Sequence, residues 1–225
     1  MSNLPSYIGF VFLFTVLITV LIFYIATKKS TATLIIILAW LILQAIISLT
    51  GFYTVTSNTP PRLTLLILPP IILIIILFTT PKGKKYIDGL NLKTLTILHT
   101  IRIPVEIVLF WLFAQKAIPQ IMTFEGRNFD IISGLTAPLI FYVCFYAMKL
   151  GRISILFWNF FCLGLLINIV IIALLSAPFP FQKFAFDQPN IAILYFPYVW
   201  IPCCLVPIVL FSHLASIRQL LKKKI

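Results

Sequence analysis

Residues 7–27 read YIGFVFLFTVLITVLIFYIAT, a run of 21 residues without a charged side chain. An α-helix rises 1.5 Å per residue, so about 20 apolar residues cross the hydrocarbon core of a membrane. The run has no basic segment before it, is longer than the apolar part of a signal peptide, and lacks a small-residue cleavage site. We therefore expect a retained transmembrane helix here.

Further apolar segments of this kind follow the first along the chain. They lie near residues 31–54, 65–80, 94–115, 134–149, 153–175 and 191–217. Seven spans with short loops use most of the 225 residues and leave no room for a soluble domain. We predict an all-α polytopic membrane protein, with residues 1–225 forming a single domain of seven transmembrane helices.

The composition of the chain supports a membrane protein. Hydrophobic residues make up 61% of the sequence and charged residues 10%, and the mean hydropathy is +1.12. A soluble domain carries about 25% charged residues, and a disordered chain has low hydrophobicity. Both classes are therefore excluded. Lysine outnumbers arginine by 12 to 5 and isoleucine is abundant, which favours a bacterial inner (cytoplasmic) membrane.

The basic residues divide unequally between the two sides of the membrane in a seven-span topology. Twelve fall on one side: Lys28, Lys29, Lys82, Lys84, Lys85, Lys93, Lys149, Arg152, Arg218, Lys222, Lys223 and Lys224. Four fall on the other: Arg62, Lys116, Arg127 and Lys183. The positive-inside rule then predicts an N-terminus outside and a cytoplasmic C-terminus. The net charge of +12 is therefore a topology signal, and no aromatic and basic platform for nucleic acid accompanies it.

The fourth span carries three ionisable residues in the run LHTIRIPVEIVLFW at residues 98–111. His99, Arg102 and Glu106 share one helix face at 100° per residue, over about 10 Å. Ionisable residues inside a membrane face the bundle interior or water, and they mark functional sites by default. Arg102 and Glu106 are also spaced to pair with each other, on either side of Pro104, which can kink the helix. The stripe is thus either a ligand site or an Arg–Glu pair that locks the helix in place.

Other spans offer polar side chains at the depths expected for this stripe. They are His213, Asn159, Asn168 and Gln44. Together they predict a pocket between span 4 and spans 6 and 7. In it, Arg102 would attract a polar or anionic group and Glu106 would serve as counter-ion or proton carrier. His99 and His213 would lie on the cytoplasmic side.

Two further features concern access to such a pocket. The seventh segment contains Pro197, Pro202 and Pro207, which predict an irregular helix that either gates the pocket or is statically bent. The outer loop after span 4 contains the acidic and basic residues Glu125, Arg127 and Asp130 around turn-forming residues. This loop either caps the pocket or folds on its own ion pairs.

Known catalytic motifs are absent from the sequence. It has no phosphate-binding glycine loop, no HExxH and no nucleophile elbow, and its four cysteines lack the spacing of a zinc site. The seventh segment has no lysine, which excludes a retinal pigment of the microbial type. We predict no cofactor, although His99 and His213 permit a haem or metal site or an intramembrane enzyme.

The leading hypothesis is a protein that binds or transports a small polar or anionic molecule. Its expected partners are that molecule and the lipid bilayer, with no nucleic acid. An accessory subunit or assembly factor of a membrane complex is a third class of function. It would add a membrane-protein partner or a second copy of the chain.

Overall fold

The computed structural model describes residues 4–222, and these are helical with no strand. Short 3₁₀ turns and one π-helical turn supplement the α-helices, and the prediction of an all-α fold is confirmed. The α-helices are α1 (Ser6–Ala26), α2 (Thr31–Leu49), α3 (Thr64–Thr79), α4 (Pro81–Asp88), α5 (Leu92–Leu98), α6 (Arg102–Ala114), α7 (Ile131–Phe145), α8 (Arg152–Leu175) and α9 (Val206–Lys222).

Within residues 4–222, five helical runs are long and apolar enough to cross a membrane. They are α1, α2, the continuous run of α5 and α6 (Leu92–Ala114), α8, and the run ending in α9 (Ile201–Lys222). A sixth is obtained if α3 and α4, which meet at an angle of 92°, form one bent span. α7 is a shorter apolar helix of 15 residues. The described chain therefore has five or six candidate membrane-spanning helices.

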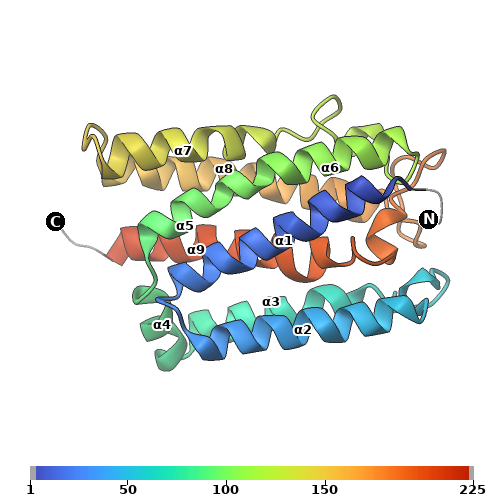
Figure 1. Ribbon diagram of the computed structural model, residues 1–225, viewed down its shortest axis with the longest axis horizontal. Coiled ribbons are helices and arrows are strands. Elements are labelled where there is room, and N and C mark those ends of the chain that lie inside the picture. Colours follow the sequence, from blue (N-terminus) through green and yellow to red (C-terminus); the bar gives the residue numbers. More distant parts are fainter. Residues whose placement is uncertain (1–3, 223–225) are drawn as a thin grey trace.

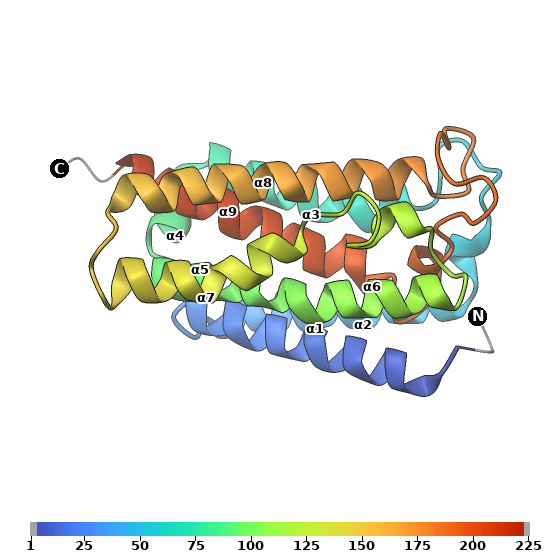
Figure 2. The ribbon, with the colours of Figure 1, turned by 90° about the horizontal axis from the view of Figure 1, so that it is seen from above.

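The long helices run side by side along one axis, and α9 lies among them (Figures 1 and 2). α9 contacts α3, α4, α5 and α8. In the most apolar stretch of the run Ile201–Lys222, 67% of the residues are buried, against 17% in α2. α9 also carries Ser212, His213 and Ser216 in its apolar sequence. His213 has hydrogen-bond partners on α6 and α8, which is consistent with the central position of this helix.

Polar residues define the ends of the helices at the end of the bundle rich in lysine. Ser30, Thr80 and Asn91 cap α2, α4 and α5, each accepting a hydrogen bond from a backbone N–H three residues later. The sharp bend between α3 and α4 needs Gly83, because a Cβ there would lie 2.3 Å from the carbonyl oxygen of Leu77. α4 therefore turns across the end of the bundle (Figure 1).

α4 is tied to α9 by ion pairs at this end. The Asp88 carboxylate lies 3.1 Å from Arg218 Nε and 2.6 Å from Lys222 Nζ. The loops 27–30 and 146–151 gather at the same end of the bundle as α4 (Figure 1). The other basic residues assigned to this side at the C-terminus, Lys223 and Lys224, lie outside the described residues.

The seventh apolar segment differs from its prediction as one helix over 191–217. Helix begins at Ile201 with a π-helical turn to Leu205 and ends at Lys222, whereas Ala192–Leu194 is a separate 3₁₀ turn. Pro197 precedes the helix, Pro202 lies in the π turn, and Pro207 is near the start of α9. Proline has no N–H to donate and a ring that disfavours a helical residue before it, so Pro197 is consistent with the late start, whereas Pro202 and Pro207 are accommodated within the helical run. The fifth segment likewise ends at Phe145 rather than at 149.

Candidate functional site

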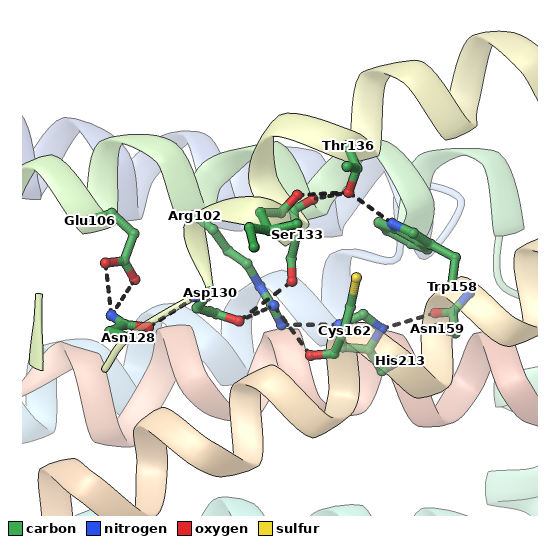
Figure 3. A network of polar contacts seen from close by, with 11 residues as sticks. Arg102, Glu106, Asn128, Asp130, Ser133, Thr136, Trp158, Asn159, Cys162 and His213 are labelled. Atoms are coloured by element: carbon green, nitrogen blue, oxygen red, sulfur yellow. Dashed lines mark hydrogen bonds and ion pairs between the residues drawn. The ribbon is translucent and has the colours of Figure 1, made fainter. Parts of the chain in front are cut away.

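Arg102 lies at the centre of a polar network inside the bundle (Figure 3). Its side chain is buried and forms an ion pair with Asp130, which directly precedes α7. Arg102 Nη2 is 3.0 Å from His213 Nε2 on α9, and Nη1 is 3.5 Å from the carbonyl oxygen of Cys162 on α8. The first residue of α6 therefore joins three neighbouring segments of the chain.

Glu106 lies one turn further along α6 and has a different partner. Asn128 Nδ2 is 2.7 Å from both carboxylate oxygens of Glu106 and 3.0 Å from the carbonyl oxygen of Met122. The Oδ1 atom of Asn128 accepts a hydrogen bond from the backbone N–H of Asp130 at 3.0 Å. Asn128 thereby connects the Glu106 carboxylate to the Arg102–Asp130 pair (Figure 3).

The contacts of His213 define its protonation. A guanidinium group can only donate, so the Nε2 atom that faces Arg102 must accept and carries no proton. The Nδ1 atom then carries the proton and donates to Asn159 Oδ1 at 2.9 Å. Asn159 Nδ2 donates to the carbonyl oxygen of Ile155 at 2.9 Å, which is consistent with Oδ1 being the acceptor. His213 is therefore a neutral imidazole with its proton on Nδ1.

His99 stacks on His213 but is not part of the hydrogen-bonded chain. The ring centroids are 3.8 Å apart with 13° between the planes, and Trp158 meets His99 edge-on at 5.5 Å. His99 is fully buried, and neither of its ring nitrogens has a hydrogen-bond partner among residues 4–222. The same is true of Arg102 Nε within that part of the chain. Such buried, unpaired atoms cost about 1–3 kcal/mol each, so a bound water, ion or ligand is the usual explanation.

Close packing of α7 fixes the position of Arg102. A Cβ on Gly134 would lie 2.9 Å from Ile103 Cγ1 and 3.3 Å from Arg102 Cβ, so a larger residue would push the two helices apart. Ser133, the preceding residue, is buried with its Oγ 3.5 Å from Asp130 Oδ1. The close approach of α7 to α6 therefore requires a small residue at position 134.

The sequence left open whether Arg102 and Glu106 pair with each other or line a ligand site, and in the structure each has another partner. Arg102 pairs with Asp130 and Glu106 with Asn128, although both partners were assigned to the outer loop. The reason is that residues 120–130 fold back into the bundle before α7 begins, and α7 covers only part of the length of α8 (Figure 2). The idea that this loop folds on its own ion pairs is therefore wrong for Asp130, whereas Glu125 and Arg127 are exposed.

The structure brings together some of the polar residues proposed from the sequence and separates others. The network contains His99, Arg102, Glu106, Asn159 and His213. Two others lie elsewhere. Gln44 accepts a hydrogen bond from Tyr53 Oη, and Asn168 donates to the carbonyl oxygen of Arg127 at 2.9 Å.

Sequence reasoning missed Asn128, the partner role of Asp130, Ser133 and the carbonyl group of Cys162. One signal was present, since the chain has only five acidic residues and Arg102 requires a counter-charge inside the membrane.

Two apolar cavities lie between the helices. One of about 210 Å³ lies between α3, α6, α8 and the start of the last helical run, and Asn190 is among its lining residues. Another of about 630 Å³ lies mainly between α2, α3 and α9. The ionisable residues of the network line neither cavity. None of the side chains expected to bind a ligand between span 4 and spans 6 and 7 lines the smaller cavity, whose wall is mostly apolar.

The network has no arrangement typical of a metal centre. Within residues 4–222, no group of three or more His, Cys, Asp or Glu side chains is placed to hold a metal ion. The stacked rings of His99 and His213 present their faces to each other. A haem bound by two imidazoles needs one ring nitrogen on each side of the iron, which this stacking does not provide.

Comparison with known proteins gives a family match but no named activity. A family model described as "Domain of unknown function (DUF8737)" matches residues 60–221. The match covers α3 to nearly the end of α9, and therefore the whole polar network. No curated protein and no solved structure matches the chain.

Proposed function

We propose that this chain, which belongs to the family Domain of unknown function (DUF8737), binds or transports a small polar or anionic molecule inside a seven-span membrane bundle. The binding element in this proposal is the network around Arg102, with His99 as the side chain that meets the bound molecule. In this proposal the protein lies in the bacterial inner (cytoplasmic) membrane, and lipid surrounds the bundle.

The proposed topology counts α3 and α7 as spans in addition to the five long helical runs. α7 has 15 residues and a length of about 22 Å, short of the roughly 30 Å hydrocarbon core. The segment 120–130 would complete this crossing, because irregular backbone is tolerated at membrane depth where protein surrounds it. The lysine-rich end then faces the cytoplasm and α1 begins outside.

The functional proposal rests on buried nitrogen atoms that have no hydrogen-bond partner among residues 4–222. Both ring nitrogens of His99 and the Nε of Arg102 are buried and unpaired within residues 4–222, three residues apart on one helix face. A polar molecule that accepts from Arg102 Nε and bonds to His99 would satisfy these atoms. The positive charge of Arg102 favours an anionic or strongly polar group, although Asp130 balances part of that charge.

If the protein transports the bound molecule, we expect the last helical run to move during transport. Pro202 and Pro207 lie at the π-helical turn and the start of α9, and both line the 210 Å³ cavity. Local π and proline irregularities often occur at functional hinges. Bending at this turn would open a path between the cavity and His213.

A thermal-shift assay on the purified protein in detergent tests the binding proposal. We expect inorganic phosphate, acetate or another anion from a defined panel to raise Tm of the wild type. His99→Phe keeps the ring stack but removes both nitrogens, and it should lose this shift. Gln44→Leu, which changes a buried polar residue outside the network, should keep it. A His99→Phe protein that responds like wild type would show that the anion does not bind at His99 and would contradict the proposed site.

A further inference from the structure

The larger cavity is an elongated apolar groove separate from the polar network. Its volume is about 630 Å³, and α2 lines it from Thr33 to Leu43, a length of about 15 Å. α3 and α9 form the other walls, with Tyr86 of α4 at the end near the lysine-rich loops. Ile36 and Leu73 line the groove and are 58% and 47% exposed, so its side opens towards lipid.

Hydrogen bonds at both ends of the groove hold α2 in position. Trp40 Nε1 donates to the carbonyl oxygen of Cys203 at 3.0 Å, deep in the bundle. Thr33 Oγ1 and Tyr86 Oη are 3.1 Å apart at the other end. Between them, the consecutive prolines Pro69 and Pro70 interrupt the backbone hydrogen bonding of α3 inside its helix. The groove is therefore braced by specific contacts at its two ends.

Exposed lysines lie close in sequence to Thr33 and Tyr86, the residues that mark one end of the groove, which we call its mouth. Lys28 and Lys29 are exposed in the turn just before α2, and Lys82 is exposed on α4, four residues before Tyr86 and on the same helix face. Lys85 is also exposed on this short helix. The acidic residue of α4, Asp88, is already engaged by Arg218 and Lys222 of α9. Among residues 4–222, none of these four lysines forms an ion pair with a carboxylate.

We propose that this groove binds an anionic phospholipid from the leaflet at the lysine-rich end. One acyl chain lies between α2, α3 and α9, where the wall is apolar and open to the bilayer. The phosphate is held by the lysines at the mouth, and the Thr33 and Tyr86 hydroxyls reach the polar part next to it. Charge at the mouth favours an anionic headgroup over a zwitterionic one. This site does not depend on the function proposed for the Arg102 network.

Native mass spectrometry of the full chain tests the proposal, with phosphatidylglycerol and phosphatidylcholine of identical acyl chains as probes. We expect the wild type to retain one phosphatidylglycerol with at least about tenfold preference. The variant Lys28→Gln/Lys29→Gln/Lys82→Gln/Lys85→Gln should lose that preference. Lys116→Gln/Lys183→Gln, which removes charge on the other side of the predicted topology, should keep it.

A second pair of variants tests the position of the acyl chain. Ala39→Trp places a large side chain in the groove and should abolish retention of both lipids. Ile46→Trp, at an exposed position of α2 that does not line the groove, should not. Equal retention of the two lipids by the wild type, or undiminished retention by Ala39→Trp, would overturn the proposal. A dimer that Ala39→Trp dissociates would assign the groove to a second copy and would also overturn it.

Fluorescence of the wild-type protein gives a second measurement, which does not require a bulky side chain in the groove. Phosphatidylglycerol with brominated acyl chains should quench tryptophan emission more strongly than brominated phosphatidylcholine at equal concentration. Trp40 lines the groove, so Trp40→Phe should remove this difference. Equal quenching by the two lipids would contradict a site selective for anionic phospholipid.

Discussion

The two sides of α9 are packed in different ways. On the side of α6, α7 and α8, buried polar side chains connect the helices through Arg102, Asp130 and His213. On the side of α2 and α3, the contacts are mainly apolar and an elongated cavity of about 630 Å³ remains. Apolar side chains gain little by leaving lipid for another helix, so polar contacts and small residues drive close packing in membranes. The comparison indicates that polar contacts determine which helices of this bundle pack closely together.

The largest expected effect comes from breaking the ion pair. Asp130→Ala leaves the Arg102 charge buried without its counter-ion and should destabilise the protein by about 3–5 kcal/mol. Asp187→Asn is the matched control, because Asp187 is exposed in the loop after α8, and it should change stability by less than about 0.5 kcal/mol. Unfolding in a detergent titration measures both.

A double variant separates the ion pair from simple packing. Arg102→Met/Asp130→Leu removes both charges and should recover much of the stability lost in Asp130→Ala, because no charge is left unpaired. A double variant less stable than Asp130→Ala would mean that the network holds the helices through more than this pair.

Close approach of α7 to α6 predicts a smaller loss. Gly134→Ala places a Cβ 2.9 Å from Ile103 Cγ1 and 3.0 Å from the backbone nitrogen of Ile103, and should cost about 1–3 kcal/mol. Gly164→Ala in α8 meets no atom within 4 Å and should be neutral or stabilising by up to about 1 kcal/mol. Equal stabilities of the two variants would show that the α6–α7 contact is less tight than these distances imply.

The groove side should respond more weakly to the loss of a polar contact. Trp40→Phe removes the hydrogen bond to the carbonyl of Cys203 and should destabilise the protein by about 0.5–1.5 kcal/mol in the same unfolding assay. A loss as large as that of Asp130→Ala would remove the distinction between the two sides of α9.

Much of the fold follows from the sequence because one physical rule governs it. A stretch of about 20 apolar residues satisfies its backbone only as a helix in lipid, so the long helices lie close to the expected segments. The 100° helical spacing also brings His99, Arg102 and Glu106 onto one inward face, and all three are buried. Local periodicity was sufficient for these inferences.

The partners of these residues depend on tertiary structure, which periodicity does not encode. Asp130 follows a loop and meets Arg102 next to the place where Gly134 of α7 packs closely on α6. Pro197 precedes the late start of the last helical run. In the last segment, the hydropathy of residues 191–200 does not distinguish a helix from a buried loop.

The smallest effect is expected where α4 meets α9, at the exposed rim of the groove side. The hydrogen bond from Lys222 holds the pKa of Asp88 below its usual value, with Arg218 acting in the same direction. Because this pKa is lowered in the folded state, the contribution is complete above the unfolded pKa of about 3.9 and is lost as the pH falls through the lower folded value. Lys222 is exposed, so the contribution should stay within about 1 kcal/mol. Tm of Asp88→Asn should therefore depend less on pH than Tm of the wild type below about pH 4. If the variant loses as much Tm in acid as the wild type, groups other than Asp88 cause the acid sensitivity.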